Sequence, residues 1–275
     1  MRKKKPKSLV LSGNGINCEL ETAHANRLVG FDVDIVHINA LTDGTTSIHD
    51  YHFLNFPGGF LDGDDLGAAK AQAVKWRYQK VPGRDTPFID ELIRFVTEGK
   101  IMIGICNGFQ LLVKTGLLPA LNGEYGKQSV TLTFNDSGRF QDRWVYLRTH
   151  PFSSCIFTRD MDRIYLPVRH GEGKLVARDE GTVKGLQENG HVVMQYADKD
   201  GNVTSEFPWN PNGSSESIAA LCDASGRIFG LMPHPEAFVH YTQHPHWTRQ
   251  DLPEEGDGLK IFRNAYTYVL NNLLQ

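Results

Sequence analysis

Residues 100–118, KIMIGICNGFQLLVKTGLL, carry the clearest structural signal in the chain. The run KIMIGI is short and continuously apolar, which is typical of a strand buried on both faces of a sheet. A Gly-x-Cys-x-Gly turn follows, with Cys106 at its tip, and the next residues have the pattern of a helix. This order predicts an α/β protein and raises the question of whether Cys106 is a nucleophile or a small buried side chain.

The segments upstream repeat this alternation of strand and helix. Residues 8–41 are expected to form a strand, a Gly/Asn loop, a helix that ends near Gly30 and a second strand. Residues 51–60 have the pattern of a third strand that ends in Pro-Gly-Gly, and residues 88–100 that of a helix. The alternation predicts an open, mostly parallel sheet with helices on both faces.

Downstream the pattern changes to short strands and hairpins, followed by an amphipathic closing helix. We expect strands at residues 129–134, 143–149, 163–170, 191–197 and 218–232, and the helix at residues 259–274. Residues 61–87 and 197–217 have the composition of inserted loops, and residues 1–7 that of a basic tail. No internal repeat is visible, so we expect a single domain over residues 1–275.

Composition is that of an ordinary soluble globular protein. The chain has 275 residues, of which 40% are hydrophobic and 22% charged, and its formal net charge is −3. This charge argues against a general nucleic-acid binder, and no apolar run approaches the ~20 residues that cross a membrane. Gly and Asn interrupt the apolar start, so we expect no secretory leader. The four cysteines are widely spaced, which fits a reducing cytoplasm and predicts neither a disulfide framework nor a zinc site.

The turn at Cys106 has the form of a nucleophile elbow. Glycines two residues before and two after the cysteine, Gly104 and Gly108, let the neighbouring backbone pass close to it. The sulfur is expected at a helix N-terminus, where the dipole favours thiolate, and the N–H of Asn107 would face a developing oxyanion. The turn alone leaves a small apolar filler as an equal alternative, because free cysteines are usually buried and inert.

A nucleophilic cysteine needs a base and a group that orients the base. The segment GLMPHPEAF, residues 230–238, contains both. If it is extended, His234 and Glu236 point to the same side, and Pro235 favours that backbone. The alternative is a rigid turn that carries two surface polar residues.

Other candidates have weaker patterns. Cys18 also lies near a helix start, but it lacks flanking glycines and a visible partner, so we expect it to be structural or to line a pocket. His240, His244 and His246 invite a metal site. No carboxylate or thiol is placed to complete a tetrahedral set, so the pattern favours a solvated loop and we expect no metal.

The segments GICNGFQLL and MPHPE together resemble the class I (triad) glutamine amidotransferases. Within that class the chain is similar to the glutaminase of phosphoribosylformylglycinamidine synthase. Further matching segments are NCELETA at 17–23, FPGGF at 56–60, RHGEGKL at 169–175, NPNGSSESIAAL at 210–221 and GLK at 258–260. The resemblance covers nearly the whole chain in order and implies a flavodoxin-like sheet.

The resemblance implies a role for each matching residue. Cys106 would be the nucleophile, His234 the base and Glu236 its orienter. Oxyanion and substrate contacts would come from Gly58, Gly59, Phe60, Asn107, Gln110, His170 and Gly171. After Phe60 this family commonly reads Ser-Tyr-Gly-Asp, and the Leu-Asp-Gly-Asp found here puts in doubt how the oxyanion loop is triggered.

The implied activity is hydrolysis of L-glutamine, with ammonia passed to a separate synthase subunit in purine biosynthesis. A small bridging subunit is a further candidate partner, and neither nucleic acid nor membrane is expected. The chain has no GxxxxGK[ST] motif, so we expect no cofactor here and place ATP and Mg²⁺ on the partner. Two alternatives remain: a glutaminase that serves a different ATP-dependent amidotransferase, and a non-catalytic regulatory homologue.

Overall fold

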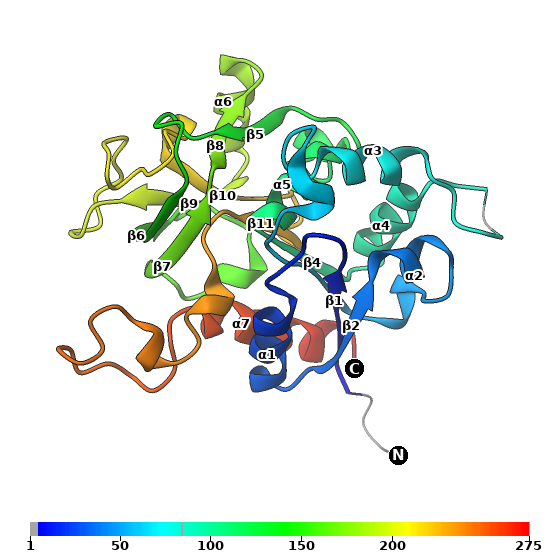
Figure 1. Ribbon diagram of the computed structural model, residues 1–275, viewed down its shortest axis with the longest axis horizontal. Coiled ribbons are helices and arrows are strands. Elements are labelled where there is room, and N and C mark those ends of the chain that lie inside the picture. Colours follow the sequence, from blue (N-terminus) through cyan, green and yellow to red (C-terminus); the bar gives the residue numbers. More distant parts are fainter. Residues whose placement is uncertain (1–4, 84, 275) are drawn as a thin grey trace.

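A nine-stranded sheet forms the centre of the computed structural model, which describes residues 5–83 and 85–274 (Figure 1). The strand order is β2-β1-β3-β4-β11-β10-β9-β6-β7, and β5 and β8 form a separate two-stranded sheet. The strands are β1 Lys7–Ser12, β2 Asp32–His37, β3 Phe53–Phe56, β4 Ile101–Ile105, β5 Val130–Phe134, β6 Gln141–Thr149, β7 Arg163–His170, β8 Glu172–Ala177, β9 Val192–Ala197, β10 Ile218–Cys222 and β11 Ile228–Leu231.

The two halves of the large sheet differ in direction. Strands β2, β1, β3, β4 and β11 run parallel to one another, whereas β10, β9, β6 and β7 continue the sheet antiparallel. This confirms the expected open α/β sheet. Every residue of β3 and β4 is buried, as the apolar run before Cys106 predicts.

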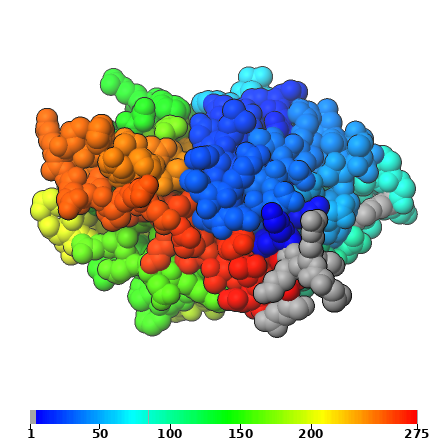
Figure 2. Space-filling model, turned by 90° about the horizontal axis from the view of Figure 1, so that it is seen from below, coloured from blue at the N-terminus to red at the C-terminus, as the bar shows by residue number. Residues whose placement is uncertain are grey.

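Helices cover both faces of the parallel half. They are α1 Glu19–Val29, α2 Ile38–Thr42, α3 Lys70–Tyr78, α4 Phe88–Thr97, α5 Asn107–Lys114 and α7 Leu259–Asn272. Helix α6, Glu180–Glu188, packs instead against β8 of the small sheet. Helices α1 and α7 lie side by side on one face, where Figure 2 shows them in blue and red, and α3 and α5 lie on the other (Figure 1). As expected, α1 ends at Gly30, which has a φ of 113°. In the described part of the chain, no helix is both long and apolar enough to span a bilayer.

The interpretation of residues 61–87 as a loop is wrong in its middle, because that segment contains α3. Trp76 of α3 is fully buried, and its ring lies 5.7 Å from that of Phe56 and 5.1 Å from that of Phe88. Charged side chains alternate with these buried positions, which hides the helical period. The segment therefore contributes to the core instead of only decorating the surface.

The other two segments set apart by composition are also more ordered than predicted. Within residues 197–217, Asn210, Asn212 and Ser214 are buried. The Asn212 amide donates to the Tyr196 hydroxyl at 3.0 Å, so buried hydrogen bonds hold this loop. The predicted tail of residues 1–7 ends earlier, since Lys7 opens β1; residues 1–4 lie outside the described range.

The nucleophile elbow between β4 and α5 depends on two close backbone contacts. Cys106 has a φ of 51° and a ψ of −105°, a conformation that side chains rarely adopt. A Cβ on Gly108 would lie 1.8 Å from the Phe56 carbonyl oxygen, and one on Gly104 would lie 2.6 Å from the Gly108 carbonyl oxygen. Both glycines are therefore required for the chain to turn here.

We predict that Gly108→Ala lowers the free energy of unfolding by more than ~3 kcal/mol, the upper end of overpacking costs, because the added methyl meets rigid backbone. Gly185→Ala in α6 is the matched control, since its Cβ would have no neighbour closer than 3.9 Å. Helix propensity favours this control substitution by up to ~1 kcal/mol. Urea denaturation of both variants measures the difference, and equal stability would contradict the account of the elbow.

Candidate active site

A pocket of about 290 Å³ opens at the carboxyl ends of the parallel strands. It is lined by Asn17, Cys18, Glu21, Gly59, Phe60, Cys106, Phe140, Arg169 and His234. Most of these residues follow β1, β3, β4 and β11, which end at the same edge of the sheet. Open α/β sheets bind ligands at this edge, so the topology brings together residues that are far apart in the sequence.

Cys106 sits at the floor of this pocket and is 6% exposed. Its backbone N–H donates to the Leu231 carbonyl at 2.8 Å, which ties the elbow to the end of β11. Its thiol faces the Arg169 carbonyl oxygen at 3.7 Å. The side chain is thus accessible only through the pocket.

His234 and Glu236 form a buried pair, each 2% exposed. Nδ1 of His234 lies 2.6 Å from Oε1 of Glu236. The prediction of an extended segment is wrong, because Pro235–Ala237 is a 3-10 turn, but the turn still brings the two side chains together. The proline stands at the first position of that turn, where its fixed φ is compatible with helical backbone.

Burial disfavours the charged imidazolium and by itself would lower the pKa of His234. The Glu236 carboxylate and the thiols of Cys106 and Cys18 outweigh burial and hold this pKa well above its usual value. Neither thiol makes a well-formed hydrogen bond to Nε2, which has no partner among the described residues. Nε2 is therefore the free end of an oriented imidazole.

Cys18 lines the pocket, as predicted, but the expectation that it lacks a partner is wrong. It lies beside His234, and burial raises the pKa of its thiol. Cys18 and His234 are 216 positions apart in the sequence. They meet only because β1 and β11 end at the same edge of the sheet, so the sequence alone does not reveal this contact.

The Pro-Gly-Gly loop after β3 packs against the loop after β1. The Gly58 carbonyl accepts from the N–H groups of Asn17 and Cys18, both at 3.3 Å, and Phe60 N–H donates to the Gly15 carbonyl at 2.7 Å. Phe60 N–H is thus engaged. In the described ranges, no hydrogen bond is made by the N–H of Gly59 or that of Asn107, so each is a free donor near Cys106.

The Asn107 side chain links this loop to the elbow. Its Oδ1 accepts from the Leu61 N–H at 3.0 Å, and its Nδ2 donates to Asp64 at 3.2 Å and to Gln110 Oε1 at 2.9 Å. The Gln110 amide in turn donates to the Glu172 carbonyl. Gln110 therefore belongs to a buried hydrogen-bond network under the elbow. It was expected to bind substrate, but it is not among the residues that line the pocket.

His170 and Gly171 do not line the pocket either. Burial lowers the pKa of His170 to about 3, and its Nδ1 lies 3.2 Å from Asn135 Oδ1. Arg169 lines the pocket instead, because adjacent residues of β7 point to opposite faces. Because side chains alternate along a strand, a buried His170 could have indicated that Arg169 faces the pocket. No such sequence pattern indicates that Phe140 lines the pocket.

The three C-terminal histidines do not form a ligand cluster among the described residues. His244 is 7% exposed, so the prediction of a solvated loop is wrong for this residue. Its ring packs against those of Trp144, Tyr165 and Phe238 at 5.5, 5.5 and 5.7 Å between centroids. The aromatic contacts account for its burial.

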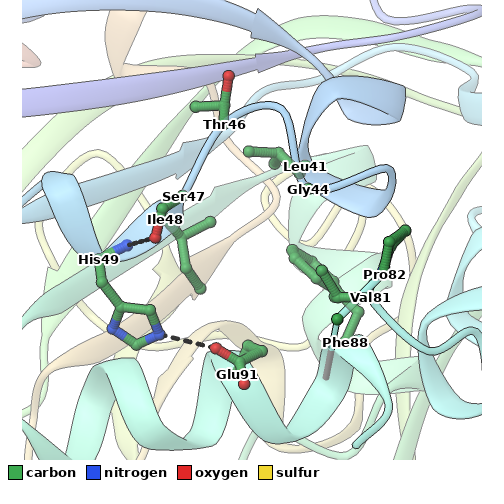
Figure 3. A pocket seen from close by; sticks show the side chains of 11 residues that line it. Leu41, Gly44, Thr46, Ser47, Ile48, His49, Val81, Pro82, Phe88 and Glu91 are labelled. Carbon is green, nitrogen blue, oxygen red and sulfur yellow. Dashed lines mark hydrogen bonds and ion pairs between the residues drawn. The ribbon is translucent and has the colours of Figure 1, made fainter. Parts of the chain in front are cut away.

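A second hollow of about 250 Å³ lies between α2, α4 and the segment around Val81 (Figure 3). The titratable side chains in its lining are His49 and Glu91, and Figure 3 shows them facing each other, with His49 Nε2 3.0 Å from Glu91 Oε2. No thiol or free base lines this hollow, so its described residues offer no comparable chemistry.

A family model for the CobB/CobQ-like glutamine amidotransferase domain matches residues 5–269. The chain is 48% identical over 265 residues to the phosphoribosylformylglycinamidine synthase subunit PurQ of Dehalococcoides mccartyi, a match that covers 96% of this chain and 98% of that protein. It is 40% identical over 274 residues to the PurQ subunit of Methanococcus maripaludis, covering 96% and 97% of the two chains. The structure of PurLQS from Thermotoga maritima is similar with a TM-score of 0.70 and 29% identity, covering 97% of this chain and 100% of that one. The chain therefore belongs to the CobB/CobQ-like glutamine amidotransferase family and, within it, to the PurQ subunits of phosphoribosylformylglycinamidine synthase.

Proposed function

We propose that this chain is the glutaminase subunit of phosphoribosylformylglycinamidine synthase and that Cys106, His234 and Glu236 hydrolyse L-glutamine. The observation that carries the proposal is the 2.6 Å contact between Glu236 Oε1 and His234 Nδ1, which leaves Nε2 free beside a cysteine at the tip of an elbow. A base oriented by a carboxylate and next to a thiol is the arrangement that nucleophilic catalysis requires.

In the first half-reaction, His234 Nε2 takes the thiol proton and Cys106 Sγ attacks the side-chain amide carbon of glutamine. The negative charge that develops on the amide oxygen is stabilised by the free N–H groups of Gly59 and Asn107. The C–N bond then breaks, and the His234 imidazolium gives its proton to the departing ammonia. A glutamyl thioester on Cys106 remains.

In the second half-reaction, His234 accepts a proton from water, and the resulting hydroxide attacks the thioester carbon. The same two N–H groups stabilise the second oxyanion. The C–S bond breaks, glutamate leaves, and the proton on His234 returns to the sulfur. Glu236 keeps the imidazole in one orientation throughout, and its charge stabilises the imidazolium in both steps.

The wall of the pocket suits an α-amino acid. Glu21 and Arg169 line it and carry opposite charges. A carboxylate and a guanidinium can bind the ammonium and carboxylate groups of free glutamine, and the guanidinium can do so in bidentate fashion. We assign these two residues to the recognition of the substrate backbone.

The ammonia would pass to a synthase subunit in the cytoplasm, which supplies ATP, Mg²⁺ and the acceptor. The PurQ relatives are themselves named as subunits, and the similar Thermotoga maritima structure is of PurLQS. A small bridging subunit would complete this complex. A glutaminase that serves another ATP-dependent amidotransferase is distinguished by which acceptor is aminated when candidate synthases are added.

We predict that Cys106→Ala in the reconstituted complex lowers glutamine-dependent synthase activity by at least ~10³-fold, because no thioester can form. Activity with added ammonium salts should be retained, which is the control for intact assembly. Amidine formation and glutamate release measure the two activities. Retained glutamate release would overturn the assignment of Cys106, and a complex without any glutaminase in the wild type would favour a non-catalytic homologue.

Glu236→Gln should move the basic limb of the pH–kcat profile to lower pH. Removing the carboxylate charge leaves burial as the dominant effect, so the pKa of His234 falls and the imidazolium is lost earlier as pH rises. His170 is neutral over this range and adds no competing charge. We also expect kcat to fall by ~10²-fold or more with little change in KM. An unchanged basic limb would contradict the assigned role of Glu236.

Asn107→Ala should lower kcat for glutamine by ~10- to 100-fold, because the loop that carries the Gly59 donor loses its link to the elbow. Alkylation of Cys106 by iodoacetamide should keep its rate, since this reaction forms no oxyanion. Asn39→Ala, at an exposed asparagine of α2, is the control. Equal losses in alkylation and turnover would show that Asn107 only maintains the elbow.

A further inference from the structure

Three metal-binding groups meet beside Gly58. A Cβ placed on Gly58 would lie 2.8 Å from His234 Cε1, 3.4 Å from Cys18 Sγ and 3.5 Å from Cys106 Cβ. Ligand atoms of Cys18, His234 and Glu236 lie within 4.8 Å of one another, and all three residues are buried. Cys106 is not part of that group of ligand atoms, but it lines the same pocket as Cys18 and His234, so both cysteines and the histidine border one space.

The histidine is prepared as a ligand. Its Nε2 has no hydrogen-bond partner among the described residues, and the side chain is 3% exposed. Its other nitrogen, Nδ1, is held by Glu236 at 2.6 Å. A carboxylate on the far nitrogen of a coordinating imidazole is the usual arrangement around protein-bound zinc, where it fixes the ring and raises its basicity.

The donor set selects the class of metal. Two sulfurs and one imidazole nitrogen suit Zn²⁺ and similar thiophilic cations, whereas Mg²⁺ and Ca²⁺ prefer oxygen. Three protein ligands leave a fourth position, which the pocket would supply to water. We propose that Zn²⁺ binds Cys18 Sγ, Cys106 Sγ and His234 Nε2, and that the bound metal reversibly blocks glutamine hydrolysis.

This inference rests on the proposed function for its effect on activity but not for the binding itself. On ligation each thiol releases one proton, and a His234 imidazolium must also release its Nε2 proton before that nitrogen can coordinate, so both the nucleophile and the base are withdrawn from the reaction. The proposal differs from the expectation of no zinc site, which considered only the spacing of cysteines and histidines along the chain.

The first test is inhibition of the assembled glutaminase by Zn²⁺, with each variant compared with its own metal-free rate. We expect the wild type to be inhibited competitively with glutamine and restored by EDTA, while Mg²⁺ has no effect. Cys18→Ser should raise the inhibition constant for Zn²⁺ by at least ~100-fold, because it removes one ligand. Cys155→Ala removes a buried cysteine that does not line the pocket and should leave inhibition unchanged. Equal inhibition of wild type and Cys18→Ser would overturn the proposal.

The second test does not require activity. Co²⁺ added to the purified chain should give a thiolate-to-metal charge-transfer absorption that Zn²⁺ displaces. Cys18→Ser and Cys106→Ala should each weaken this absorption, and Cys155→Ala should retain it. If the absorption follows this pattern while glutamine is not hydrolysed, the metal site stands and the proposed function fails. If no thiolate band appears, the metal site fails irrespective of activity.

Discussion

The close contact between Gly108 and the Phe56 carbonyl is the constraint on which the site depends. It brings the start of α5 against the end of β3, and so places the Pro-Gly-Gly loop next to Cys106. The parallel register of β4 and β11 then determines where the chain leaves β11, and His234 follows three residues after that strand. Two buried charges can persist there because Glu236 and His234 neutralise each other; removing either partner would leave an unpaired buried group.

Much of the fold could be predicted from local pattern. The continuous apolar run of β4 and the glycine that ends α1 are signals of short range, and both predictions are confirmed. Helix α3 was missed because its buried positions, including Trp76, are interleaved with lysine and arginine. Strand β8 and helix α6 were missed as well. Strand β8 pairs only with β5, so its partner lies about forty residues away and its own sequence is too short to define it.

The site was predicted less evenly than the fold. The elbow is predicted by glycines two positions before and after Cys106, and the pairing of His234 with Glu236 by their separation of two positions. His234 and Glu236 do lie together in the structure. Contacts that join separate strand ends could not be deduced, and Cys18 beside His234 is the main example. Gln110 was expected to contact substrate because it lies one turn after the elbow; in the structure its side chain accepts a hydrogen bond from Asn107 and is not among the residues that line the pocket.

The central claim is that Cys106, and not the neighbouring Cys18, attacks the amide carbon of glutamine. The most direct measurement is peptide mass spectrometry after incubation with an electrophilic glutamine analogue, with excess glutamine as competitor. The account predicts a single adduct on the peptide that contains Cys106, suppressed by glutamine and absent in His234→Ala. An adduct on Cys18, or labelling of Cys106 that glutamine does not suppress, would contradict it.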